Sequence, residues 1–315
     1  MTQQILVPLD GSTLAETAIS HAIVLARTTG GALHLLRTVV PLTSIAMLAQ
    51  PMLTTADLER WSAAEHTAAR AYLALVATQL STTGLAVATT VVEGDPAATI
   101  LALAAATPAI REIVVASPGR RSMEQWLFGS VAEKVVHAAT VPVLVVPVQA
   151  HNEAPEMARA RLPLDRDHRY ATILVPLDGS AFAEQALEPA RQLAQRCDAH
   201  VVLVSVIPVL DDLSFVASGI IPVWARVNQH LQPAAAAYLA TIAQRLAPHC
   251  GPVRTRSFDG PPATMITAAA AEERADLIVM ATHGRSGLSR LWLGSVATRV
   301  LQHTDRPVLL IRPLE

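Results

Sequence analysis

Apolar runs alternate with helical patterns along this chain, and the alternation begins at Ile5. The run Ile5-Leu-Val-Pro-Leu is apolar throughout, which predicts a strand that ends at the turn Asp10-Gly11-Ser12. Leu14, Ala18 and Ala22 then recur at helical spacing. Further strands are predicted in the same half of the chain: Ala32 to Val40, Val87 to Val92, Glu112 to Ala116 and Val141 to Val146. Helices are predicted between them, among them about Thr55 to Leu80 and Pro96 to about Ala106. Such alternation favours an α/β fold with a parallel sheet covered by helices on both faces.

The second half of the chain repeats the first. Ile173 to Ser180 is identical, residue for residue, to Ile5 to Ser12. Three later segments correspond in the same order: Val201 to Ile207 with Leu33 to Val39, Leu277 to Ser295 with Glu112 to Ser130, and Pro307 to Ile311 with Pro142 to Val146. Two copies of one unit of roughly 145 residues account for the length of the chain.

The stretch between the two copies has a different composition. From Pro147 to Arg169 the chain carries charged residues and prolines with little apolar periodicity, which is typical of a linker. The predicted organisation is therefore a first domain at residues 1–148, a linker at 149–169 and a second domain of the same type at 170–315.

Charge and cysteine content argue against several classes of function. The 315 residues carry a net charge of −2 without a basic block, so we expect neither nucleic acid nor an anionic membrane surface as a partner. No apolar run is long enough to span a membrane, and the first residues lack the features of a signal peptide. Cys197 and Cys250 have neither CxxC spacing nor metal-type partners, which favours free thiols in a reducing cytoplasm.

A glycine-rich loop follows the fourth strand of each copy and leads into a helix. The loop residues of the second copy are Gly284, Arg285, Gly287, Gly294 and Ser295. Their counterparts in the first copy are Gly119, Arg120, Gly129 and Ser130. In both copies nine residues separate the two outer glycines, Gly119 from Gly129 and Gly284 from Gly294. Backbone N–H groups at such a helix start, aided by the helix dipole, are able to hold a phosphate.

An aspartate turn follows the first strand of each copy, at Asp10 and Asp178. In a doubly wound sheet the ligand lies beyond the carboxyl ends of the strands, where the strand order reverses. If the first and fourth strands are neighbours, each aspartate meets the glycine loop of its own copy there. Two plainer interpretations stay open. Both aspartate turns are also typical helix caps, and both Gly-Ser pairs are also typical helix starts.

The paired copies resemble the universal stress protein family in its tandem two-domain form, over nearly the whole chain apart from the linker. The nucleotide signature of that family is G-x2-G-x9-G-[S/T], and its first strand ends in a Pro-x-Asp turn. The residues that match are Pro8, Asp10, Gly119, Gly129 and Ser130 in the first copy, and Pro176, Asp178, Gly284, Gly294 and Ser295 in the second. Alanine replaces the first glycine in both copies, at Ala116 and Ala281, and Pro118 stands where the second copy has His283.

The resemblance implies two Rossmann-like domains, each with a doubly wound parallel sheet of five strands in the order 3-2-1-4-5, that bind ATP accompanied by Mg²⁺. Asp10 and Asp178 would reach the adenosine, and the backbone at Thr38 and Val206 would edge the adenine. The phosphates would be held by the loop glycines and serines, with added charge from Arg120 and Arg285. Because proline lacks an N–H group, Pro118 leads us to expect better binding in the second copy.

The sequence favours a binding protein over an enzyme. It contains no nucleophile elbow, Walker lysine or zinc-protease helix, so at most slow hydrolysis of bound ATP is expected. The resemblance implies an ATP-binding stress or regulatory protein; a nucleotide-free interaction scaffold and an ATP-using enzyme of the related α/β superfamily remain alternatives. The fifth strands would pair within the chain. A homodimer is expected, with Leu42 to Leu53 and Leu213 to Val223 as the candidate contact segments. Further protein partners are expected but unknown.

Overall fold

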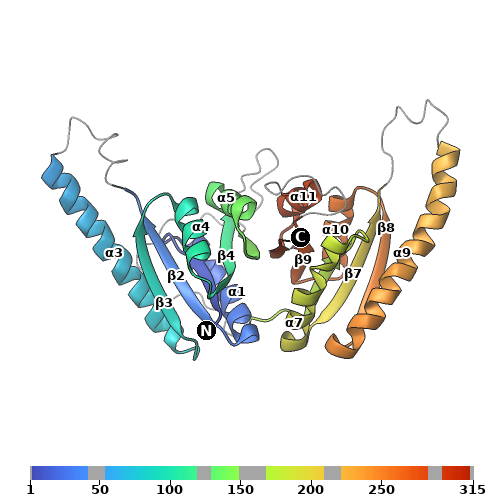
Figure 1. The fold of residues 1–315 in the computed structure, drawn as a ribbon, viewed down its shortest axis with the longest axis horizontal. Coiled ribbons are helices and arrows are strands. Elements are labelled where there is room, and N and C mark those ends of the chain that lie inside the picture. Colours follow the sequence, from blue (N-terminus) through green and yellow to red (C-terminus); the bar gives the residue numbers. More distant parts are fainter. Residues whose placement is uncertain are drawn as a thin grey trace. The chain divides into compact units, whose positions relative to one another are not determined.

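The computed structural model contains two compact units, unit 1 (Met1–His168) and unit 2 (Arg169–Glu315) (Figure 1). The structure describes residues 2–41, 54–118, 129–148, 168–208, 221–282 and 293–312, with the backbone alone at 221–229. Within these residues, no helix is both long enough and apolar enough to cross a bilayer. Most of the two segments expected at a dimer interface, residues 42–53 and 213–220, lies outside the described residues.

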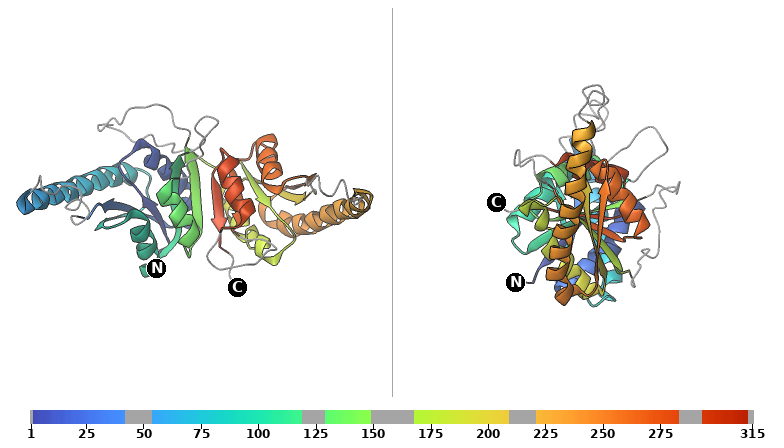
Figure 2. Two further views of the ribbon diagram at one scale, coloured as in Figure 1. Left: turned by 90° about the horizontal axis from the view of Figure 1, so that it is seen from above. Right: turned by 90° about the vertical axis from the view of Figure 1, so that its right-hand side faces the viewer.

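Unit 1 has a parallel sheet of five strands in the order β3-β2-β1-β4-β5. The strands are β1 (Gln4–Pro8), β2 (Ala32–Val39), β3 (Val87–Glu93), β4 (Ile110–Pro118) and β5 (Val143–Val148). The helices are α1 (Thr13–Thr29), α3 (Thr55–Ser81), α4 (Pro96–Ala106) and α5 (Ser130–Ala138). Helices α1 and α3 cover one face of the sheet, and α4 and α5 pack together on the other (Figure 2).

Unit 2 repeats this arrangement with the strand order β8-β7-β6-β9-β10, again in parallel. Its strands are β6 (Thr172–Pro176), β7 (His200–Ile207), β8 (Val253–Asp259), β9 (Leu277–Ala281) and β10 (Val308–Ile311). Its helices are α6 (Ala181–Glu184), α7 (Leu187–Cys197), α9 (Ile221–Cys250), α10 (Pro262–Glu272) and α11 (Ser295–His303).

The predicted fold class is confirmed, because each unit has five parallel strands in the order 3-2-1-4-5. The fourth strand is longer than predicted, since β4 starts at Ile110 and ends at Pro118. The fifth strand starts later than predicted, at Val143. Pairing with the neighbouring strands sets these ends: β4 already pairs with β1 at Ile110, and the ladder between β4 and β5 begins at Ile113 opposite Val143. The ladder between β4 and β5 continues to Pro118 opposite Val148, two residues beyond the apolar run that the prediction rested on.

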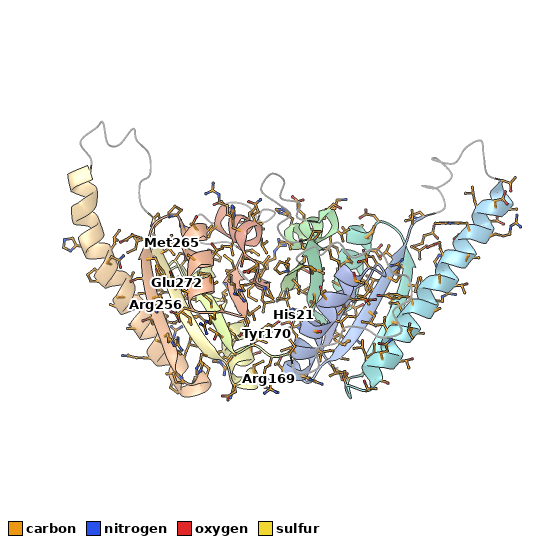
Figure 3. The ribbon with its side chains drawn as sticks, turned by 180° about the vertical axis from the view of Figure 1, so that it is seen from behind. His21, Arg169, Tyr170, Arg256, Met265 and Glu272 are labelled. Carbon is orange, nitrogen blue, oxygen red and sulfur yellow. The ribbon has the colours of Figure 1, made fainter. Side chains whose placement is uncertain are left out.

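The core of each unit lies between its sheet and its helices, where side chains fill the space (Figure 3). Leu6 and Val7 of β1 are fully buried, as expected of a parallel strand that has helices on both faces. The helical pattern predicted after the first strand is also confirmed, because Ala18 and Ala22 are fully buried on α1. Both cysteines of the chain are free thiols.

The strand registers show which residues of the two units are equivalent. Ile5 of β1 pairs with Leu33 of β2, and Ile173 of β6 pairs with Val201 of β7. Counting four residues along each second strand makes Arg37 the counterpart of Ser205. The same comparison across the fourth strands makes Glu112, opposite Ile5, the counterpart of Leu277, opposite Ile173. Two sheets of the same geometry therefore carry different chemistry at matching positions.

Candidate functional site

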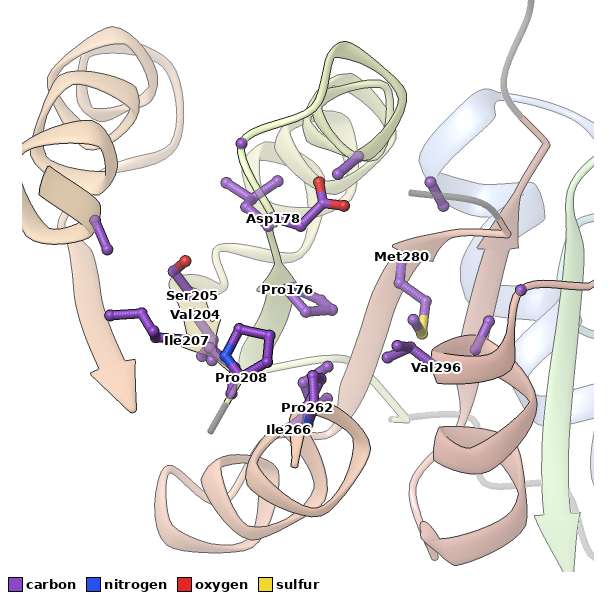
Figure 4. Close-up of a pocket in the computed structure, with 18 of the residues that line it drawn as sticks. Pro176, Asp178, Val204, Ser205, Ile207, Pro208, Pro262, Ile266, Met280 and Val296 are labelled. Carbon is purple, nitrogen blue, oxygen red and sulfur yellow. The ribbon is translucent and has the colours of Figure 1, made fainter. Parts of the chain in front are cut away.

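A cavity of about 490 Å³ opens in unit 2 beyond the carboxyl ends of β6, β7 and β9 (Figure 4). The strand order reverses between β6 and β9, so this is the place where doubly wound sheets hold their ligands. The volume suits a small molecule, for which pockets of about 300 to 1,000 Å³ are usual. Most of the lining is apolar, with a few polar groups between the apolar walls.

Five residues predicted from the sequence of the second copy line this cavity together: Pro176, Asp178, Val206, Gly294 and Ser295. They come from the end of β6, the end of β7 and the start of α11, which are far apart in the sequence. The other three, Gly284, Arg285 and Gly287, lie outside the described residues. The structure therefore brings the aspartate turn of unit 2 and the helix start that follows β9 to one cavity.

The aspartate turn of unit 2 is a helix cap as well as part of the cavity wall. Oδ1 of Asp178 accepts hydrogen bonds from the backbone N–H of Ser180 at 2.9 Å and from its hydroxyl at 2.6 Å. The Ser180 hydroxyl oxygen in turn accepts from the N–H of Ala183 at 3.1 Å and so caps α6. Gly179 has a positive φ of 82°, which suits glycine. The capping interpretation is confirmed, and the carboxylate of Asp178 still lines the cavity (Figure 4).

Helix α11 begins at the cavity without a side-chain cap, because its N-cap residue is Gly294. The N–H of Gly294 donates to the carbonyl of Thr282 at 2.8 Å, and the carbonyl of Gly294 accepts from Thr298 at 2.9 Å. The three residues between them, Ser295 to Ala297, belong to the first turn, whose N–H groups have no partner within the helix. All three line the cavity. A helix start of this kind attracts anions through its N–H groups and its dipole.

Helix α9 forms a further wall, and its contribution was not predicted from the sequence. Leu231 and Tyr238 of α9 line the cavity. The Tyr238 hydroxyl donates to Oε1 of Glu184 at 3.1 Å, and Nη2 of Arg245 lies 3.2 Å from Oε2 of the same carboxylate. Burial first, and the negative charge of Glu184 second, raise the pKa of Tyr238, so the phenol stays protonated and remains a donor.

The equivalent turn in unit 1 has the same capping bonds. Oδ1 of Asp10 accepts from the backbone N–H and the hydroxyl of Ser12, at 2.8 and 2.5 Å, and Ser12 caps α1. Pro8 ends β1, and Thr38 lies near the end of β2 opposite Val92 of β3.

The helix start of unit 1 differs from that of unit 2. Gly129 is the N-cap of α5 and, like Gly294, provides no side-chain cap. A Cβ atom placed on Gly129 would lie 3.1 Å from Cδ of Pro118, so the proline ring packs directly against this helix start. The N–H of Gly129 donates to Oγ of Ser117 at 3.4 Å. Ser130 opens the helix as predicted, whereas Gly119 and Arg120 lie outside the described residues.

Arg37 of unit 1 is a further residue that sequence reasoning missed. Its guanidinium carbon lies 5.9 Å from the centre of the Tyr72 ring, and its Nη1 lies 3.1 Å from the point where a Cβ atom on Gly11 would be. The counterpart in unit 2, Ser205, lines the cavity. Aligning the two copies along their second strands would have revealed this difference, because both strands have the same register with their neighbours.

Comparison with known proteins agrees with this geometry. The model of the universal stress protein family matches residues 1–147 and 169–312. A universal stress protein of Mycolicibacterium smegmatis is 26% identical over 309 residues, which cover 98% of this chain and 97% of that protein. A universal stress protein of Methanocaldococcus jannaschii is 33% identical over 147 residues, which cover 46% of this chain and 84% of that protein.

The fold is shared with a solved structure of the same description. The crystal structure of a universal stress protein from Archaeoglobus fulgidus DSM 4304 matches with a TM-score of 0.68 at 19% identity, and the match covers 98% of each chain. The family model matches once in each unit. The chain therefore belongs to the universal stress protein family, as a member with two tandem domains.

Proposed function

We propose that this protein binds an adenine nucleotide, ATP with Mg²⁺, in the unit 2 cavity and acts as a stress or regulatory protein whose occupancy sets its contacts with a protein partner. The observation that supports this most is the convergence of Asp178, Val206 and the uncapped start of α11 on one cavity. A nucleotide needs an apolar slot, a hydroxyl acceptor and an anion site, and the three features supply one of each.

The adenosine half would occupy the side of the cavity formed by β6 and β7. Ile266 and Pro262 of α10 offer apolar surface there (Figure 4), and the Asp178 carboxylate is an acceptor for ribose hydroxyls. The ladder between β6 and β7 ends at Val204, so the backbone of Val206 lies beyond it and would meet the edge of the base. A carboxylate on this side also repels the phosphates, which orients the nucleotide.

The phosphate half would lie at the start of α11, on the N–H groups of Ser295 to Ala297. Mg²⁺ would be held through phosphate oxygens and water, as is usual for this ion. In the part of the chain that the structure describes, no group of three acidic, histidine or cysteine side chains is placed to bind a metal by itself. The nucleotide and its ion would therefore enter together.

Helix α9 would connect nucleotide binding in the cavity to the protein surface. This helix of 30 residues contributes Leu231 and Tyr238 to the cavity wall, and its outer face includes exposed residues such as Arg245. A ligand that contacts Tyr238 changes the free energy of this helix in its present position. Filled and empty forms would thus present different surfaces to a partner.

The test uses the full purified chain. Nucleotide released by acid is identified by mass spectrometry, and thermal unfolding is followed with Mg-ATP, Mg-GTP and Mg²⁺ alone. At about 100 times Kd, ATP should stabilise the protein by about 2.7 kcal/mol, or about 5 to 10 °C in Tm. Protein that contains no nucleotide and shows no shift at millimolar Mg-ATP would leave the nucleotide-free scaffold as the answer. Multiple turnovers of ATP with an acceptor would show an enzyme instead.

A further inference from the structure

Arg37 and Ser205 occupy the same position in the two units, and they differ greatly in size and charge. The registers of β2 with β1 and with β3 match those of β7 with β6 and with β8. Ser205 is a small polar residue that borders the unit 2 cavity on the side assigned above to adenosine. The equivalent place in unit 1 is the region beyond the carboxyl ends of β1, β2 and β4, here called the unit 1 edge.

The Arg37 side chain extends across the unit 1 edge. A Cβ atom added to Gly11 would lie 3.1 Å from Nη1 of Arg37. Gly11 directly follows Asp10, the residue that would meet the ribose. The guanidinium faces the ring of Tyr72 on α3 at 5.9 Å, a cation–π contact. Nη1 is buried and has no hydrogen-bond partner among the described residues. The group that would have to make room for a nucleoside is therefore held between the turn and the helix.

The surrounding charges favour this position of Arg37. The Tyr72 hydroxyl donates to Oε1 of Glu16 at 3.0 Å, and burial, Glu16 and Asp10 raise the pKa of Tyr72 while Arg37 lowers it. At Tyr72 the positive charge of Arg37 thus opposes the negative charges of Glu16 and Asp10. In the absence of this cation, those carboxylates and the phenol would face one another without compensation.

Unit 2 keeps the same tyrosine–glutamate pair but supplies the cation from another place. Tyr238 and Glu184 match Tyr72 and Glu16, and the cation on Glu184 is Arg245, whose side chain is 61% exposed on α9. Arg245 follows Tyr238 by seven residues, and the residue that follows Tyr72 by seven residues on α3 is Gln79. The positive charge lies on the helix surface in unit 2 and beyond the carboxyl end of β1 in unit 1, so the position that Arg37 fills in unit 1 is occupied in unit 2 by the small Ser205 of the cavity wall.

We propose that Arg37 blocks the adenosine side of the unit 1 edge, so that the chain holds one nucleotide, in unit 2, and that the choice between arginine and serine at this position decides which unit binds. This inference rests on the proposed function. Arg37 would act at the adenosine side, in addition to Pro118, which acts at the phosphate side. The two obstacles lie at the adenosine end and the phosphate end of the place that a nucleotide would occupy in unit 1.

The test exchanges the two residues in the full chain. Isothermal titration calorimetry with Mg-ATP gives the stoichiometry of the wild type, R37S, S205R and the double exchange R37S/S205R. We expect one nucleotide per chain in the wild type, two in R37S, the second bound more weakly because Pro118 is still present, and none in S205R, whose affinity falls by about a hundredfold or more. The double exchange should bind one nucleotide again, with hydrogen-exchange protection moved from the peptides of unit 2 to those of unit 1.

The outcomes distinguish a failure of the role of Arg37 from a failure of the proposed function. Two nucleotides on the wild type, or a single one on R37S, would overturn the role of Arg37 while the proposed function stands. No binding by either protein would overturn the proposed function itself. Arg70→Ser removes a cation from an exposed position of α3 and is the matched control, which should leave one nucleotide bound. Because S205R adds bulk, its circular dichroism and Tm are checked; R37S removes bulk and keeps the test valid if S205R fails to fold.

Discussion

The two units have the same sheet architecture and differ at the carboxyl ends of their strands, where a ligand would bind. Strand order and register are the same in both units, because they depend on the apolar pattern of the strands and not on the identity of single residues. The chemistry at the carboxyl ends depends on single positions. Arg37 faces Gly11 where unit 2 has Ser205, and the ring of Pro118 packs on Gly129 at a helix start that in unit 2 lines a cavity. The comparison shows that a repeated fold conserves its architecture far more readily than its site.

The bond that holds each glycine at its helix start illustrates this divergence. In unit 2 the N–H of Gly294 donates to the backbone carbonyl of Thr282 at 2.8 Å, whereas in unit 1 the N–H of Gly129 donates to the Ser117 hydroxyl at a longer 3.4 Å. The Thr282 carbonyl is part of a backbone that is itself held by a hydrogen bond from the Thr282 N–H to the Ile311 carbonyl at 2.9 Å, while a hydroxyl rotates. The start of α11 is thus better oriented for a ligand than the start of α5.

The largest effect expected from a single substitution is the loss of nucleotide binding in Gly294→Val. The backbone of Gly294, with φ −59° and ψ 147°, suits any residue, so valine should be accommodated without strain while its methyl groups cover the N–H groups of α11. Affinity for Mg-ATP should fall by about a hundredfold, or about 2.7 kcal/mol, in a calorimetric titration.

Gly129→Val is the matched substitution in unit 1, and it should leave nucleotide affinity unchanged. Its Cβ would lie 3.1 Å from Cδ of Pro118, so we expect a lower Tm instead. Equal losses of affinity in the two valine variants would show that both units bind, and the contrast drawn here between the two edges would be wrong.

A buried carboxyl group gives the next largest contrast. Glu112 of β4 has a buried Oε2 without a hydrogen-bond partner among the described residues, and burial raises its pKa from 4.5 to about 7; unit 2 has Leu277 at this position. Because the unfolded chain releases the proton first, unit 1 should lose stability as pH rises from about 4.5 to about 7 and then level off, a total of about 1 to 3 kcal/mol.

Glu112→Gln removes this titration and keeps the shape of the side chain. Its stability should equal that of the wild type near pH 4.5 and exceed it by about 1 to 3 kcal/mol at pH 8, measured by hydrogen exchange on peptides of unit 1. Glu59→Gln, at an exposed position of α3, is the control and should change little. A constant difference across the pH range would mean that Glu112 does not titrate in this way.

The fold was predictable because its signals are local. Val87 to Val92 was predicted as a strand from its β-branched residues and is found as β3, and a helix predicted from about Thr55 to Leu80 is found at Thr55–Ser81. The turn at Asp178 was also predictable, since a strand, an aspartate and a glycine follow one another in the sequence. Strand ends were less certain, as β4 shows, because the partner strand decides where pairing stops.

The composition of the cavity was only partly predictable. Asp178 and Gly294 were found because turns and helix starts have sequence signatures. Tyr238 was missed because it enters from α9, and no local pattern states which long helix will cover a given strand end. Arg37 was missed for a similar reason. An arginine on a strand is usually solvated, whereas here Nη1 is buried and the guanidinium contacts Tyr72, 35 residues later in the sequence.

The smallest expected effect concerns an ion-pair cluster of unit 2 whose two arginines have no counterpart at the matching positions of unit 1. Arg256 donates to Oε1 of Glu273 at 2.7 Å and Arg254 to Oε2 at 3.0 Å, whereas the matching positions of β3 are Thr90 and Ala88. The bond from Arg256 is the largest cause that lowers the pKa of Glu273. The cluster therefore stabilises unit 2 above the unfolded pKa, and this is lost as pH falls through the lowered value.

The Glu273 side chain is only 4% exposed, but Glu273→Gln should cost only about 0.5 to 1 kcal/mol at pH 7, because the two arginine side chains are 60% and 55% exposed and water screens both ion pairs. The loss should shrink in 1 M salt, where the screening length is about 3 Å. Glu272→Gln, one residue earlier at an exposed position of α10, is the matched control and should be neutral. Hydrogen exchange on unit 2 measures both variants. A loss above about 3 kcal/mol that persists in salt would show that Glu273 acts as a buried charge, because removing one partner of a buried pair costs that much.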